Sequence, residues 1–407
     1  MPIPPILDVF VVWHPDDRTG AERFADLNEH FHSPAFSGLA GGAVEVYARS
    51  EPWVPGTSAP RPLGIDAPLG NGLPPAQFNA IVPIIDTNLA RAVADASDGW
   101  GAYIHEIAAL NHRDGVGVYP LVADGFNWAN TVVNGILGEG QTLPTQVNLD
   151  SGLFGRELAQ AITQHIQLEA GLPTRLKVFV SHTKHRSTEE AARSGPAIFE
   201  SVREHIAQTH LTTFFDAQDI QPGEDWEQTL EGGAASSALL MVRTDVYAGR
   251  DWTQREVRTA KRSGMPVVCM YALTAGEERG SFLMDHVPSV VCDLTDPDPG
   301  IEMALNRLVD EALKNTLWRE QTSYLSEDGF DWLPAQSPEP TTLAPWLAEH
   351  QEKQPDDDHI WVIHPDPPLG PAERGVLLQL CALAGYDVDV DIFTPRTFAA
   401  RGGALRQ

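Results

Sequence analysis

The sequence predicts an α/β protein with doubly wound, mostly parallel sheets, and three observations support this fold class. Short runs of β-branched and aromatic residues alternate along the chain with helix-like segments, an order typical of parallel sheets. These runs are apolar at almost every position, as expected for strands that are covered on both faces. A similar opening also recurs three times, as LDVFVVWHPDDR from Leu7, LKVFVSHTKHR from Leu176 and HIWVIHPDPP from His359. We therefore expect three successive α/β segments.

The first segment is expected to span residues 1–172. Its predicted strands are residues 8–14, 43–49, 78–86 and 116–123, and its predicted helices are residues 21–33, 99–112 and 155–171. A long loop rich in proline and glycine, residues 50–75, separates the second strand from the third. The last helix closes before Pro173, so we place the boundary between Gly171 and Arg175.

The middle segment, residues 175–321, has the most regular pattern. Its predicted strands are residues 177–182, 212–218, 237–244, 266–272 and 287–294, and its predicted helices are residues 194–209, 225–237, 251–264 and 300–317. Ile198, Val202 and Ile206 recur at helical spacing in the first of these helices. The helix at 251–264 ends at a glycine after two basic residues, as helix C-termini favour. Five strands with their helices predict one doubly wound domain with a five-stranded sheet.

The strand–helix pattern stops at residues 322–358, which are rich in proline and acidic side chains. Such a composition has little room for a core, so we expect a linker. Residues 359–407 follow as a small βαβ unit, with strands at 359–365 and 387–393 and a helix at 371–386. Because so small a unit has too little core to stand alone, it is expected to pack on another domain, to pair with another chain, or to begin a longer domain.

The formal net charge of −28 argues against direct binding to nucleic acid or to an anionic membrane surface, both of which need clustered Lys and Arg. No apolar run approaches the ~20 residues of a membrane helix, and the N-terminus lacks the basic start of a signal peptide. The three cysteines are too scattered for a disulfide frame or a metal site. His14 and His364 each precede Pro-Asp, which is typical of a strand exit and turn rather than of a metal ligand. We expect a cytoplasmic protein without a metal site.

The stretch YAGRDWTQREVRTA, residues 247–260, begins like a loop and ends like a helix. Trp252 and Glu256 are four residues apart, so they share one face of that helix. Taken alone, a helical glutamate beside Arg255 and Arg258 is an ordinary solvated charge, and a tryptophan is an ordinary core residue. The residues around this pair are what favour a functional interpretation.

Four stretches in the middle segment, in order, resemble a TIR domain, the Toll/interleukin-1 receptor fold of immune proteins and many bacterial defence effectors. They are VFVSHTKHR (residues 178–186), FFDAQDIQPGEDW (residues 214–226), VRTDVYAGRDWTQRE (residues 242–256) and GMPVVCMYA (residues 264–272). They look like the first strand and its loop, the second strand and the BB loop, the fourth-strand exit with a W-x-x-x-E helix, and the next strand. The resemblance covers about Arg175 to Gln321 and implies a flavodoxin-like fold.

This resemblance implies that the domain cleaves the nicotinamide–ribose bond of NAD⁺, which would be a substrate rather than a cofactor. Products in such relatives are ADP-ribose or cyclic forms of it. Glu256 is then the catalytic residue, with Trp252 beside it. The other substrate-binding positions implied are Phe179, Ser181, His182, Lys184, Arg186, Gln221, Gly223 and Trp226. The sequence departs from many relatives at Thr183, where a basic residue is frequent, and at Gln221, where an acidic residue can occur.

The first segment resembles the same fold more weakly. Trp100 is present, but Ile104 stands four residues later, and Glu106 lies on another side of the helix. We therefore expect a degenerate TIR-like domain that serves assembly or sensing. Relatives act as homo-oligomers or filaments through TIR–TIR contacts, in which the BB loop completes a neighbouring site. Two alternatives stay open: a non-enzymatic TIR scaffold or adaptor, and a nucleotide-sensing TIR protein.

Overall fold

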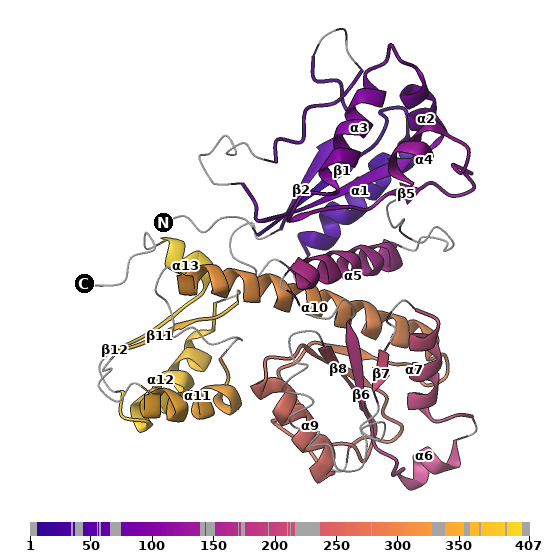
Figure 1. The fold of residues 1–407 in the computed structure, drawn as a ribbon. Coiled ribbons are helices and arrows are strands. Elements are labelled where there is room, and N and C mark those ends of the chain that lie inside the picture. The colour runs from indigo at the N-terminus through magenta and orange to yellow at the C-terminus, as the bar shows by residue number, and fades with distance from the viewer. Residues whose placement is uncertain are drawn as a thin grey trace. The chain divides into compact units, whose positions relative to one another are not determined.

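The computed structural model (Figure 1) describes most of the chain. The described residues are 6–33, 36, 44–54, 56, 58–65, 75–138, 143, 151–169, 171, 176–193, 195–209, 211, 213–215, 237–277, 279–327, 338–353, 359–365, 368–386 and 389–400. They fall into two compact units, one formed mainly by residues 1–169 and the other mainly by residues 170–393. The helix α13 (Pro395–Ala400) belongs to the first unit. No helix of the described residues is long and apolar enough to cross a membrane.

The first unit is built on a parallel sheet. Its strands are β1 (Leu7–Val12), β2 (Val44–Arg49), β3 (Phe78–Ile85), β4 (Val116–Val118) and β5 (Leu121–Val122). Its other helices are α1 (Arg18–Phe31), α2 (Thr87–Ala94), α3 (Trp100–Leu110), α4 (Val132–Leu137) and α5 (Ser151–Glu169). The strand order is β2-β1-β3-β4, with β5 also paired to β3. Because β1 and β3 are buried along their whole length and apolar except at Asp8 and Asn79, they form the centre of this sheet, as their sequences predict.

The predicted strand 116–123 is interrupted where it pairs with β3. Its two parts, β4 and β5, pair with β3 at Asn79–Ile81 and at Ile84–Ile85. Between them lies Pro120, which has no backbone N–H to give to the ladder. The neighbouring amides keep the register, since Tyr119 N donates to Ile81 O and Ala123 N donates to Ile85 O.

The second unit holds a five-stranded parallel sheet with the order β10-β9-β8-β6-β7. These strands are β6 (Lys177–Ser181), β7 (Thr213–Phe215), β8 (Ser237–Arg243), β9 (Val267–Tyr271) and β10 (Ser289–Val291). Its helices are α6 (Thr188–Ala192), α7 (Ile198–Ala207), α9 (Asp251–Arg262) and α10 (Asp298–Glu327). The order of β7, β6, β8 and β9 follows the same crossover pattern as β2, β1, β3 and β4 in the first unit. The prediction of a doubly wound parallel α/β fold is confirmed.

Side chains of this second sheet alternate between its two faces. Phe179, Leu239, Met241 and Cys269 pack with Val257 and Ala260 of α9 in one core cluster. On the other side α10 contacts β8, β9 and α7, and Figure 1 shows α9 across the strands from α7 and α10. Ser181 is two residues beyond Phe179, so it points towards the α9 side of the sheet.

Most of the C-terminal segment, as far as Phe393, belongs to the second unit. It contains β11 (His359–Ile363) and β12 (Asp389–Phe393), paired in parallel, with α12 (Pro371–Leu383) between them. The expected βαβ unit is therefore confirmed. It gains a further helix from the predicted linker, α11 (Pro340–Lys353), whose Leu343 and Leu347 are buried against this unit. Helix α11 also contacts α9, so the small unit packs on the domain that precedes it.

Candidate functional site

The N-terminal end of α9 is tied to the turn before it by side-chain hydrogen bonds. Thr253 Oγ1 lies 2.7 Å from Tyr247 O and 2.9 Å from Arg250 O, and its single proton is shared between these two acceptors. Gln254 Nε2 donates to Ala248 O at 2.8 Å. These bonds satisfy carbonyls of the turn and fix the direction in which the helix leaves it. The first turn of α9 is thereby placed beside the end of β6.

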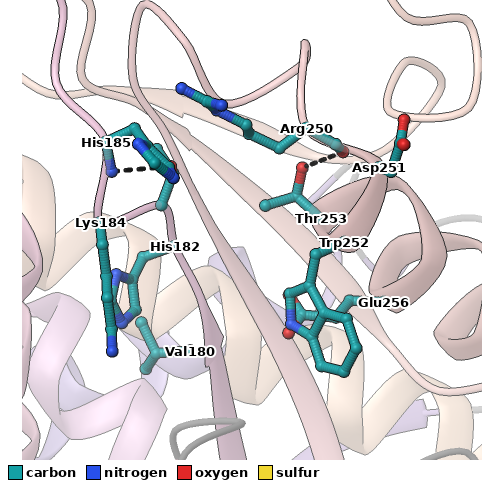
Figure 2. Close-up of a pocket in the computed structure, with 10 residues that line it drawn as sticks. Val180, His182, Lys184, His185, Arg250, Asp251, Trp252, Thr253 and Glu256 are labelled. Carbon is teal, nitrogen blue, oxygen red and sulfur yellow. Dashed lines mark hydrogen bonds between the residues drawn. The ribbon is translucent and has the colours of Figure 1, made fainter.

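A cavity of about 350 Å³ opens between the end of β6 and the start of α9. Its lining residues are Val180, His182, Thr183, Lys184, His185, Arg250, Asp251, Trp252, Thr253 and Glu256. Figure 2 shows His182, Lys184 and His185 on one wall, with Trp252 and Glu256 across from them. The carboxyl ends of parallel strands are where open α/β sheets bind ligands, so this position is typical of a ligand site.

Trp252 and Glu256 have opposite exposures although they share a helical face. The Trp252 side chain is 43% exposed, whereas Glu256 is 5% exposed. In the view of Figure 2 the indole ring lies in front of the Glu256 side chain. A large exposed aromatic ring is available to a ligand, and a buried carboxylate needs hydrogen bonds to offset its lost hydration.

Ser181 supplies such a bond. Its hydroxyl donates to Glu256 Oε2 and also contacts the hydroxyl of Tyr247. Tyr247 is fully buried, and burial together with the Glu256 charge raises the pKa of its hydroxyl well above its usual value. The tyrosine therefore keeps its proton at all ordinary pH values.

The wall opposite Glu256 carries basic and ring groups. The His182 ring stacks on Phe199 of α7, with 4.1 Å between ring centroids and an interplanar angle of 6°. The backbone N–H of His185 donates to Thr183 Oγ1, which shapes the loop after β6. Lys184 is exposed at the cavity, and Arg250 adds a second cation from the α9 side. Asp251 and Glu256 add two carboxylates to the same lining, so the cavity offers two cations to a negatively charged group of a ligand without being basic as a whole.

The loop after β9 is held near the site by Asp245. Burial acts to raise the pKa of Asp245, but hydrogen bonds from Thr274 N, the Ser187 hydroxyl and the amides of Ala275 and Gly276 outweigh it and lower that pKa. One carboxylate thus joins the loop after β6 to the loop after β9.

The structure separates the residues predicted from the sequence into groups. Trp252, Glu256, His182 and Lys184 line the cavity, and Ser181 lies directly behind it. Phe179 is 6% exposed within the core cluster, and the exposed Arg186 does not line the cavity. Gln221, Gly223 and Trp226 lie outside the described residues, as does the predicted helix 225–237 except for its last residue.

Sequence reasoning missed several residues of this site. They are Val180, His185, Arg250, Asp251 and Thr253 in the lining and Tyr247 behind it. Those in the lining are within two residues of positions that were predicted, so adjacency was the available signal for them. Tyr247 is five residues from Trp252, but its contact with Ser181 joins positions 66 residues apart and has no local signal in the sequence.

Within its described residues, the first unit has apolar side chains at the positions that match Ser181 and Glu256. The matching openings of β1 and β6 place Val12 where the second unit has Ser181. Trp100 and Ile104 of α3 are both fully buried in its core. His14 contacts Trp100 with ring centroids 5.8 Å apart. The W-x-x-x-E pattern is therefore replaced by apolar packing.

A family model described as TIR domain matches residues 178–304 and does not extend to the first unit. No curated protein matches. Among solved structures, a similar chain is tagatose-6-phosphate ketose/aldose isomerase from Escherichia coli, with 11% identity over 77% of this chain and 83% of that one. Its TM-score is 0.20, so nothing about fold or function follows from it.

The family match covers β6 to the start of α10 and includes the cavity with Trp252 and Glu256. Residues 178–304 of this chain are therefore a TIR domain.

Proposed function

We propose that the TIR domain is an NAD⁺ nucleosidase, which cleaves the bond between nicotinamide and ribose. The observation that carries this proposal is the Glu256 carboxylate, 5% exposed, in the wall of a cavity that also presents the half-exposed Trp252. TIR domains are often NAD⁺-cleaving enzymes, and Glu256 stands at the position that the sequence resemblance assigns to their catalytic glutamate.

The chemistry suits this arrangement. When the bond from ribose C1′ to the pyridinium nitrogen breaks, its electron pair goes to nitrogen and nicotinamide leaves as a neutral molecule. The ribose becomes an oxocarbenium-like cation, as in glycoside cleavage. A nearby carboxylate stabilises this cation and can hold the ribose hydroxyls. Water then bonds to C1′ and loses a proton, which gives ADP-ribose, or a nitrogen of the substrate's adenine attacks instead and gives a cyclic product.

The other cavity residues have separate roles in this proposal. The Trp252 ring packs against the substrate, as its exposed face allows. Lys184 and Arg250 offset the charge of the pyrophosphate. The volume of about 350 Å³ lies near the lower end of the range of roughly 300–1,000 Å³ for small-molecule sites.

We further propose that the protein acts in the cytoplasm, in antiphage or immune defence, as a homo-oligomer or filament formed through TIR–TIR contacts. This part rests on the family resemblance, in which the BB loop with Gln221, Gly223 and Trp226 completes a neighbour's site. An enzyme that consumes NAD⁺ has to be inactive until triggered, and assembly provides such control.

The decisive experiment measures nicotinamide release from NAD⁺ by the purified full chain, at low and high protein concentration and with a crowding agent. We expect release by the wild type, and loss of it in Glu256→Gln and Glu256→Ala. Glu204→Gln, which changes an exposed glutamate of α7, is the matched control and should keep wild-type activity.

If the wild type releases no more nicotinamide than Glu256→Gln under all of these conditions, the enzymatic proposal is wrong. Nucleotide-induced thermal stabilisation of that silent protein would then indicate a nucleotide sensor, because a ligand that binds the folded state raises its apparent stability. Absence of any such shift would leave the TIR scaffold.

A further inference from the structure

The Glu256 carboxylate is held from behind by two hydroxyl groups that do not line the cavity. Ser181 Oγ donates to Glu256 Oε2, and the Tyr247 hydroxyl oxygen lies 2.5 Å from Ser181 Oγ. A serine hydroxyl has a single proton to donate. Since that proton is directed to the carboxylate, Tyr247 must be the donor to Ser181. Both hydrogen bonds are therefore donated in the same direction, from Tyr247 to Ser181 and from Ser181 to Glu256.

The three residues come from three places in the fold and meet where little water reaches. Ser181 ends β6, Tyr247 lies in the turn after β8, and Glu256 is in the second turn of α9. Their exposed fractions are 2%, 0% and 5%. Hydrogen bonds in so dry an environment are strong, and the lost partner of a truncated hydroxyl is not easily replaced by solvent. The raised pKa of Tyr247 agrees with its role as a permanent donor.

We propose that Ser181 and Tyr247 are positioning residues, which hold the Glu256 carboxylate in the orientation that bond cleavage needs. This inference rests on the proposed function. A glutamate side chain has several rotatable bonds, and a reacting group displaced by about 1 Å loses much of its effect. By fixing one carboxylate oxygen, these two hydrogen bonds set the position at which the carboxylate meets the ribose.

The kinetic test uses Tyr247→Phe, Ser181→Ala and the double variant of the full chain, with NAD⁺ as the substrate. Each single variant should lower kcat by about tenfold to a hundredfold, the effect of losing a hydrogen bond to a charged group, with KM changed less than about twofold. The double variant should be no slower than Ser181→Ala, because the two hydroxyls act in series.

Two matched control variants each remove a hydroxyl of the same domain that takes no part in the hydrogen bonds between Tyr247, Ser181 and Glu256. Tyr271→Phe removes a hydroxyl that accepts from Arg243, and Ser237→Ala removes a buried hydroxyl at the opposite end of the sheet. Both should keep the wild-type kcat. Wild-type kcat in Tyr247→Phe and Ser181→Ala would overturn the inference, and so would losses that multiply in the double variant.

Crystal structures of Tyr247→Phe and Ser181→Ala separate this inference from the proposed function. The Glu256 carboxylate should leave its wild-type position in both variants, while the ring at 247 stays in place. A carboxylate that keeps its position in both overturns the inference, whatever the rates. A displaced carboxylate in a protein whose wild type releases no nicotinamide would support the positioning role and overturn only the NAD⁺ nucleosidase proposal.

Discussion

Trp100 and Trp252 begin similar helical stretches but have opposite environments. Trp100 is fully buried among Tyr103, Ile104 and other core residues of the first unit, whereas Trp252 is 43% exposed at the cavity. The residue four positions later decides the difference, because Ile104 joins a core and Glu256 has to reach polar partners. The two tryptophans should therefore respond differently to truncation.

Trp100→Ala is expected to lower the free energy of unfolding by about 3–5 kcal/mol, the cost of removing a fully buried aromatic side chain. Trp252→Ala should lower it by less than about 1 kcal/mol, as is usual for exposed positions, while reducing nicotinamide release. Denaturant unfolding and the NAD⁺ assay check both. A larger stability loss in Trp252→Ala than in Trp100→Ala would contradict this interpretation.

Asp8 is a buried acid at the start of β1, 4% exposed, and its Oδ1 atom has no hydrogen-bond partner among the described residues. Burial and the charge of Glu45 raise its pKa to about 7, against the opposing charge of Arg49. Between about pH 4 and pH 7 the folded chain thus holds a proton that the unfolded chain has released. The contribution of Asp8 to stability falls as pH rises through this window and stays low above it.

Asp8→Asn should abolish the loss of stability between about pH 4 and pH 7. It should also stabilise the first unit at pH 8, by at most about 4 kcal/mol at roughly 1.4 kcal/mol for each pKa unit. Denaturant unfolding at pH 5 and pH 8 measures the difference. Asp114→Asn, an exposed aspartate of the same unit, is the control and should keep the wild-type dependence. An equally steep dependence in Asp8→Asn would show that another group causes it.

At the scale of elements, the strands of both units and the long helices were predicted, but short helices and interruptions were not. Helix α2 is too short for its periodicity to stand out, and the break between β4 and β5 depends on pairing with β3 at each side of Pro120. Helix α11 was missed because its stretch looks like an acidic linker, with Pro345 inside it. Its buried leucines gain their partners only from β11 and α12.

The contact between α9 and α11 contains a partly buried ion pair. Lys261 is 6% exposed, and its Nζ donates to Asp285 O at 3.0 Å and to the Glu339 carboxylate at 3.2 Å. The helix with Trp252 and Glu256 at its beginning is thus fastened to the C-terminal segment at its end. A link of this kind should contribute to the stability of the second unit.

A double-mutant cycle with Lys261→Met and Glu339→Gln should show a coupling energy in the range of about 0.5–3 kcal/mol for residues in one ion-pair network. Thermal or denaturant unfolding of the full chain provides the four values. The control cycle is the i,i+4 pair Arg307 and Glu311 of α10, whose cation is more exposed than Lys261, and about 0.5 kcal/mol or less is expected there. Equal coupling in both cycles would mean that burial adds nothing to the first pair.

For the whole molecule, the proposed assembly predicts that two inactive variants regain activity when they are mixed. If the BB loop of one subunit completes the site of another, Glu256→Gln and Trp226→Ala should each be inactive alone. Mixed together, they should regain part of the nicotinamide release, since one supplies the loop and the other the carboxylate. A mixture as inactive as its components would indicate that the loop serves its own subunit.

The sequence by itself determined the class of fold, the mostly parallel character of its sheets and the identity of the TIR segment. Those features depend on local patterns, namely apolar runs, helical spacing and short motifs in a fixed order. It also determined that Trp252 and Glu256 share a helical face, which follows from a spacing of four.

Only the tertiary structure decided which polar groups surround Glu256 and what the pair of residues faces. The cavity exists because the end of β6 and the start of α9 meet. The hydrogen bond between Tyr247 and Ser181 likewise joins residues from separate elements. Phe179 and Ser181 looked alike as site residues in the sequence, yet one is core and the other bonds the carboxylate. Spacing places residues along one element, whereas contacts between distant elements arise only when the sheet and its helices pack.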